Sequence, residues 1–246
     1  MINKTSLVDK NAKIGKNVSI GAYTIIHDNV EIGDDTVIES HCEIGYPTKL
    51  AGESPLIIGK RSLIRSHSIF YQGSVFGDDL VTGHRVTIRE KTVAGRNLQI
   101  GTLCDFQGDC EIGDYVRTQS NIFIAKYSKI GNFIWIFPHV VLTNDPHPPS
   151  DYHVGVTIDD YAVIATMSVV LPGVTIGCHS LVAAHSLVRE DVHPGTVVGG
   201  SPAKKICATT KIKLKDGSNG MAYPWPKHFH RGYPEKIVNE WRKEYS

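Results

Sequence analysis

A short stretch near the middle of the chain gathers side chains that can move protons. Residues 136–149, IFPHVVLTNDPHPP, include His139, Asp145 and His147. An imidazole has an unperturbed pKa near 6.5, so at neutral pH it can take a proton from an attacking hydroxyl or ammonium group. A carboxylate such as Asp145 could hold the other ring nitrogen and favour the required tautomer. This stretch therefore holds the candidates for a general base.

A six-residue period runs through most of the chain and must position these side chains. Every sixth residue over 14–44 is isoleucine, and runs over 58–142 and 158–188 place Ile, Val, Leu or Phe at nearly every step. Six is neither the 3.6 of a helix nor the 2 of a plain strand. The period indicates a coil of short strands whose inward side chains stack into one core. Gly repeatedly follows the inward residue, which suits a corner that turns sharply or has a positive φ.

Two interruptions and the end of the period divide the chain. Residues 46–57 and 143–157 are rich in Pro, Gly and polar side chains and are predicted to leave the coil as loops. We expect a repeat domain over residues 1–206 and a C-terminal extension over 207–246. The extension is expected to cap the open end of the coil and to contain a helix from about Pro234 to Lys243, and the alternative is that it shapes the acceptor pocket.

Composition argues against several classes of protein. The 26 Lys+Arg and 25 Asp+Glu give a formal net charge of +1, unlike a general nucleic-acid binder. The N-terminal stretch lacks the continuous apolar segment of a secretory signal, and the most apolar run, 133–137, is too short to span a membrane. Five cysteines without a CxxC pair suggest free thiols. We expect a cytoplasmic protein that binds neither nucleic acid nor membrane.

The hexads resemble those of the hexapeptide-repeat acyltransferase family over roughly residues 8–206. The resemblance implies an all-β fold, a left-handed parallel β-helix with three hexads per coil and about nine or ten coils here. Acetyltransferases of this type build their active sites between adjacent β-helices, so the resemblance also implies a homotrimer.

Two segments resemble acceptor sites of this family. The segment around His147 is similar to galactoside and maltose acetyltransferases, in which a proline-bounded His acts as general base. The match assigns that role to His147, with Asp145 beside it, although Pro146 stands where those enzymes usually have Gly. One coil earlier, Gln119 and Asn121 resemble a stretch of nucleotide-sugar N-acetyltransferases whose Asn contacts the acceptor amine, which makes Asn121 a third catalytic candidate.

The last repeats resemble the closing coils of hexapeptide acetyltransferases, including the LPGVTIG turn and the final GGSPAK. In those enzymes this face binds coenzyme A through backbone groups at small-residue turns and through basic side chains. The resemblance implies acetyl-CoA as acyl donor and no metal. The matching positions are Thr166, Ala184, Arg189 and Lys204.

The acceptor favoured by these resemblances is the amino group of a nucleotide-linked amino sugar. Besides the TND run and the Gln119–Asn121 stretch, the loop at 46–57 resembles one in the UDP-N-acetylglucosamine acyltransferases of lipid A synthesis. One alternative is O-acetylation of a free sugar or other small acceptor. Another is a metalloprotein resembling γ-class carbonic anhydrases, which would need His84, His139 and His147 to converge. A non-catalytic scaffold is the third class.

Overall fold

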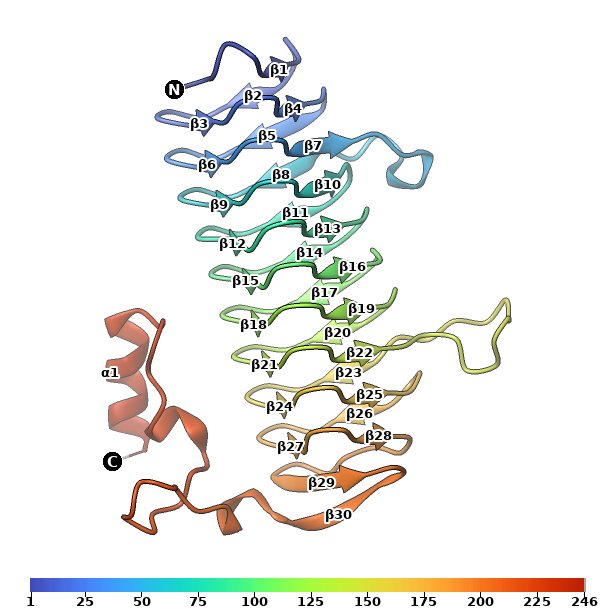
Figure 1. The fold of residues 1–246 in the computed structure, drawn as a ribbon, viewed down its shortest axis with the longest axis vertical. Coiled ribbons are helices and arrows are strands. Elements are labelled where there is room, and N and C mark those ends of the chain that lie inside the picture. The colour runs from blue at the N-terminus through green and yellow to red at the C-terminus, as the bar shows by residue number, and fades with distance from the viewer. Residues whose placement is uncertain (246) are drawn as a thin grey trace.

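The six-residue period winds the chain into a triangular solenoid. The structure is a computed structural model that describes residues 1–245, and its longest sheet has 11 strands (Figure 1). The predicted β-helix is therefore confirmed, with about eleven turns where the sequence predicted nine or ten.

Three sheets form the sides of the solenoid, and the chain visits them in the order B, C, A. Their strands pair in parallel, except that β30 pairs antiparallel with β29. Sheet A contains β3 (Ser19–Ile20), β6 (Val37–Ile38), β9 (Leu63–Ile64), β12 (Val81–Thr82), β15 (Gln99–Ile100), β18 (Arg117–Thr118), β21 (Trp135–Ile136), β24 (Val163–Ile164), β27 (Leu181–Val182), β29 (Thr196–Gly200) and β30 (Ala203–Ala208). Sheet B contains β1 (Leu7–Val8), β4 (Ile25–Ile26), β7 (Glu43–Tyr46), β10 (Ile69–Tyr71), β13 (Thr87–Ile88), β16 (Asp105–Phe106), β19 (Phe123–Ile124), β22 (Val141–Leu142), β25 (Val169–Val170) and β28 (Leu187–Val188). Sheet C contains β2 (Lys13–Ile14), β5 (Val30–Ile32), β8 (Leu56–Ile58), β11 (Val75–Phe76), β14 (Val93–Ala94), β17 (Glu111–Ile112), β20 (Lys129–Ile130), β23 (Thr157–Ile158) and β26 (Thr175–Ile176).

The inward residues of successive turns stack in register and fill the interior. On sheet B, Ile26 pairs with Ile44, and Ile44 pairs with Phe70, all of them buried. The glycines after the inward residues serve close approach between turns, because a Cβ on Gly33 would lie 2.6 Å from the backbone N of Lys60. Gly45 has the positive φ predicted for such corners (83°), whereas at Gly33 and similar corners the positive φ falls two residues later, on side chains such as Asp35 (φ 59°).

Both predicted loops leave the solenoid at the corner between sheets B and C (Figure 1). Loop 1 (residues 47–55) joins β7 to β8 and contains the 3-10 helix η1 (Lys49–Ala51). Loop 2 (residues 143–156) joins β22 to β23. The two segments therefore project from the same edge, several turns apart along the axis.

The C-terminal extension packs along the side of the solenoid, so the prediction that it caps the open end is wrong. After the β29–β30 hairpin come η2 (Thr209–Lys211), η3 (Trp225–Lys227) and α1 (Glu235–Glu244), and α1 lies beside the middle turns (Figure 1). The corner between sheets C and A carries a ladder of stacked rings, Tyr115, Phe133 and Tyr161. Trp225 and Trp241 pack against this ladder, because it offers a large apolar stripe for aromatic rings to bury.

A buried guanidinium fixes the extension in place. Arg117 lies over the ring of Tyr233 at 4.7 Å and donates to the carbonyl of Gly232 at 3.0 Å. Trp225 adds a hydrogen bond from Nε1 to the carbonyl of Tyr161, also at 3.0 Å. Within residues 1–245 no helix is long and apolar enough to cross a bilayer.

Candidate active site

Loop 2 presents His147 to solvent, and Asp145 shapes the loop around it. One oxygen of Asp145 accepts from the backbone N of His147 at 3.0 Å and from Oγ of Ser150 at 2.7 Å, and the other accepts from the backbone N of Ser150 at 3.1 Å. The Ser150 hydroxyl and these backbone donors lower the pKa of the Asp145 carboxyl.

The predicted contact between Asp145 and the ring of His147 is replaced by a different arrangement. The imidazole that approaches the Asp145 carboxylate is that of His153, with Nε2 and Oδ2 4.0 Å apart. A short proline-rich turn explains this, because the carboxylate is occupied by the amides of its own loop. Sequence spacing gave no signal for Ser150 or His153 as partners of Asp145.

A buried ionic cluster lies at the corner between sheets B and C, the corner from which loop 2 also leaves in a later turn. Glu90 is fully buried, and its carboxylate lies 3.3 Å from Arg89 and 3.2 Å from Nζ of Lys126. Lys126 also contacts Asp109 at 3.1 Å. Burial by itself would raise the pKa of Glu90, but a backbone hydrogen bond, Lys126 and Arg89 together lower it. Burial would lower the pKa of Lys126, and the two carboxylates raise it.

We expect Lys126→Met to lower the free energy of unfolding by about 3 kcal/mol, near the lower end for breaking a buried ion pair, because Arg89 still faces Glu90. The lowered Glu90 pKa stabilises the fold above the usual glutamate pKa of about 4.3, and this is lost as pH falls through the folded value. The raised Lys126 pKa contributes below about 10.4 and is lost as pH rises through the folded value. Urea unfolding at pH 7, where both contributions are present, measures how far Lys126→Met lowers the free energy of unfolding.

The matched control is Lys129→Met. Lys129 pairs with Glu111 at 3.5 Å on the exposed surface of sheet C, so its loss should cost less than about 1 kcal/mol. Equal effects of the two substitutions at pH 7 would contradict a stabilising role for the buried cluster.

The corner between sheets A and B holds the other predicted small-molecule contacts. Asn121 occupies the left-handed position of its turn (φ 60°), with an exposed side chain. Thr166 and Ala184 occupy the same turn position in successive coils, where the backbone N of His185 donates to the carbonyl of Thr166 at 2.9 Å. The half-exposed Thr166 and exposed Ala184 leave an open edge of small side chains.

The two predicted basic residues lie at the C-terminal end of the solenoid. Arg189 follows β28 and is exposed. Lys204 lies on β30, paired in register with Gly199 of β29, and its side chain is 70% exposed. Its Nζ is 4.0 Å from Glu190, a surface pair that leaves the ammonium able to meet a phosphate.

One protomer does not bring the predicted catalytic set together. His147 and Asp145 project from the corner between sheets B and C, whereas Asn121, Thr166 and Ala184 lie at the corner between sheets A and B. The metalloprotein alternative gains no support, because no group of three His, Cys, Asp or Glu side chains within residues 1–245 is arranged to hold a metal. His84 instead places Nδ1 2.8 Å from Oγ of Ser66.

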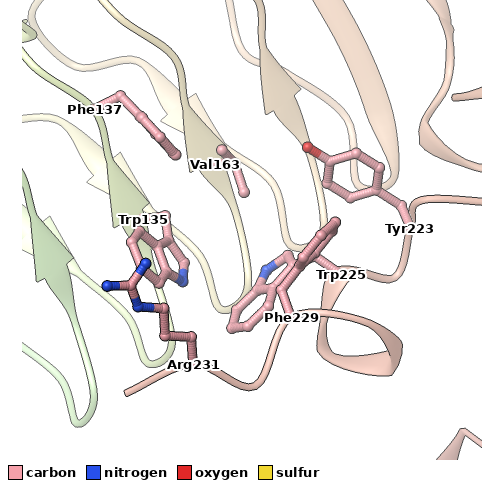
Figure 2. A pocket seen from close by; sticks show the side chains of 7 residues that line it. All are labelled: Trp135, Phe137, Val163, Tyr223, Trp225, Phe229 and Arg231. Carbon is pink, nitrogen blue, oxygen red and sulfur yellow. The ribbon is translucent and has the colours of Figure 1, made fainter. Parts of the chain in front are cut away.

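An aromatic pocket between sheet A and the C-terminal extension was not predicted. Its volume is about 340 Å³, and Figure 2 shows the side chains that line it: Trp135, Phe137, Val163, Tyr223, Trp225, Phe229 and Arg231. The run MAYPWPKHFHRGYP was visible in the sequence, but its hexad-free pattern did not indicate which side of the solenoid it would cover.

Comparison with known proteins places the chain among transferases. The family model "Bacterial transferase hexapeptide (six repeats)" matches residues 11–46. The acyl-[acyl-carrier-protein]–UDP-N-acetylglucosamine O-acyltransferase of Stutzerimonas stutzeri is 33% identical over 216 residues, covering 83% of this chain and 72% of that protein. The solved UDP-N-acetylglucosamine acyltransferase of Arabidopsis superposes with a TM-score of 0.70 at 19% identity, covering 85% of this chain and 74% of that one.

Other relatives match over shorter stretches. Two yeast proteins whose names refer to acetyltransferases, from Saccharomyces cerevisiae and Schizosaccharomyces pombe, are 33% and 36% identical. The matched stretches cover 47% and 31% of this chain and span 62% and 41% of those proteins, less than two thirds of their length.

Proposed function

Because this chain belongs to the hexapeptide-repeat acyltransferase family, we propose that it moves an acetyl group from acetyl-CoA to the amino group of a nucleotide-linked amino sugar. His147 is the proposed general base. The UDP-N-acetylglucosamine named in the S. stutzeri relative supports a nucleotide-sugar acceptor. The proposal places the reaction in the cytoplasm.

The proposed reaction uses groups that the chain supplies. The acceptor nitrogen attacks the thioester carbonyl of acetyl-CoA, and the imidazole of His147 takes the proton that the nitrogen loses. The carbon–sulfur bond then breaks, and the protonated His147 passes its proton to the departing coenzyme A thiolate, which leaves as the free thiol. The turns at Thr166 and Ala184 hold the pantetheine, Arg189 and Lys204 face the phosphates, and Asn121 contacts the acceptor.

The observation that carries this proposal is the division of the site between two corners of the solenoid. Loop 2 bears His147 on one corner, and the small-residue edge with Asn121 lies on another. A second copy can supply the missing half, and a closed ring of identical copies gives every protomer the same environment. We therefore propose a homotrimer with one active site at each interface.

O-acylation is the second candidate, because the S. stutzeri relative is named as an O-acyltransferase that uses an acyl carrier protein. In that reaction a sugar hydroxyl replaces the amine, and an acyl carrier protein replaces coenzyme A as donor. The base and the acceptor loops could serve either chemistry.

An assay of thiol release separates these proposals. We expect turnover of acetyl-CoA with UDP- or dTDP-linked amino sugars, and light scattering during gel filtration should give about three times the 27.1 kDa of one chain. Free galactosides, maltose and unrelated amines, and an acyl carrier protein donor, form the comparison set. Turnover confined to free sugars would reject the nucleotide-sugar acceptor, and a fully active monomer would reject the shared site.

A further inference from the structure

The aromatic pocket is open in a single protomer and has a cation at its rim. The rings of Trp135 and Trp225 form two of its walls, and Phe229 is half exposed beside them (Figure 2). The guanidinium of Arg231 is exposed and has no ion pair or hydrogen bond among residues 1–245. The pocket therefore suits an apolar segment that also carries a negative charge.

Loop 2 is a segment of that kind. It contains Pro146, Pro148 and Pro149, and the ring of Tyr152 beyond them is 66% exposed. Asp151 beside Tyr152 is exposed and has no ion pair among the described residues. Proline-rich segments bind aromatic-lined grooves in many recognition domains, because their stiff backbone loses little entropy on docking.

The pocket and loop 2 lie at the same height along the solenoid and on opposite sides of it. Trp135 of β21 and Val163 of β24 form the sheet wall of the pocket, and loop 2 joins β22 to β23 between them in the sequence. Figure 1 shows loop 2 projecting away from the side that the C-terminal extension covers. Loop 2 thus does not reach the pocket of its own protomer.

A rotation about an axis parallel to the solenoid keeps the height of every residue. In the trimer proposed above, such a rotation would carry loop 2 of one protomer to the level of the pocket on its neighbour. The pocket also adjoins the small-residue edge, because the backbone N of Phe137 donates to the carbonyl of Ile164 at 2.9 Å, two residues before Thr166.

We propose that loop 2 of each protomer docks in the aromatic pocket of the next. Its prolines and Tyr152 pack on the aromatic side chains, and Asp151 pairs with Arg231 of the neighbouring copy. This contact delivers His147 to the corner that carries Asn121 and Thr166. It rests on the proposed trimer and is independent of which acyl group or acceptor is used.

Hydrogen exchange of the full-length protein tests this contact. The backbone amides of Asp151, Tyr152 and His153 donate no hydrogen bond within the described protomer, so only docking would slow their exchange. We expect slow exchange there in the wild type. Arg231→Glu and Asp151→Lys should each speed it about tenfold, corresponding to about 1.4 kcal/mol, and the double variant should restore slow exchange.

Lys236→Glu, on α1 outside the pocket, is the matched control and should leave exchange in loop 2 unchanged. Protected amides in α1 would confirm that Arg231→Glu has not released the extension. Three results would each overturn the proposal. The amides at 151–153 could be unprotected in a wild-type trimer, the wild type could be a monomer, or Arg231→Glu could have no effect on exchange. Protected amides in a protein without acetyltransferase activity would instead reject the proposed function and leave the docking intact.

Discussion

Replacing His147 with alanine is expected to lower turnover about 10²–10⁴-fold, the usual contribution of a general base. The side chain is exposed on loop 2 and contributes nothing to the buried stack of the solenoid. Thermal unfolding and acetyl-CoA affinity should therefore match the wild type. Steady-state thiol release and calorimetric titration with coenzyme A measure the two quantities.

His153→Ala is the matched control for this result. His153 belongs to the same loop and is the imidazole nearest to Asp145, at 4.0 Å. We expect it to retain turnover within about tenfold, a change equivalent to about 1.4 kcal/mol. Wild-type turnover by the His147 variant with a large loss in the His153 variant would transfer the role of base to His153.

Ala184→Trp is expected to weaken acetyl-CoA binding at least about a hundredfold, or roughly 2.8 kcal/mol. The Ala184 side chain is exposed at the small-residue corner, so an indole there would fill the space proposed for the pantetheine without disturbing the core. The expected signature is a raised KM for acetyl-CoA with unchanged unfolding. Titration with coenzyme A gives the affinity directly.

Ala22→Trp provides the control for added bulk. Ala22 occupies the same corner position near the N-terminal end, where its carbonyl accepts from the backbone N of His41 as that of Thr166 accepts from His185. Coenzyme A affinity should be unaffected there. A similar loss in both variants would show that bulk at this corner acts through the fold and would remove Ala184 from the donor site.

The architecture was predictable because a single physical requirement repeats along the chain. Each turn must bury one large side chain per sheet. Ile26 and Ile44 are therefore one coil apart, and Ile44 and Phe70 are separated by one coil plus loop 1. Both loops could be located because the six-residue spacing of these buried side chains breaks where the chain leaves the coil. The sequence predicts a conformational role for the glycines at the corners, whereas Gly33 serves the close approach of the next turn, because it lies against the backbone of Lys60.

The side-chain partners within the site could not be read from the period. Two histidines and several backbone amides lie close enough in sequence to bind the Asp145 carboxylate. In the folded loop, the carboxylate accepts hydrogen bonds from backbone amides and from Ser150. The position of the extension depended on a ladder of rings spaced by whole coils, which pairs Tyr115 with Phe133 across one turn. Such packing is set by tertiary contacts that no short sequence motif contains.

The central claim is that loop 2 of one protomer and the small-residue corner of another form each active site. Mixed trimers of His147→Ala and Ala184→Trp chains, co-refolded in equal amounts, test it most directly. The assay uses acetyl-CoA near the wild-type KM, where both parents are nearly inactive because the Ala184→Trp chain has a raised KM. Random assembly should give about a quarter of the sites both intact halves, so activity should return to about a quarter of the wild type. Activity that stays at the level of the parents in mixed trimers of verified composition would contradict the shared site.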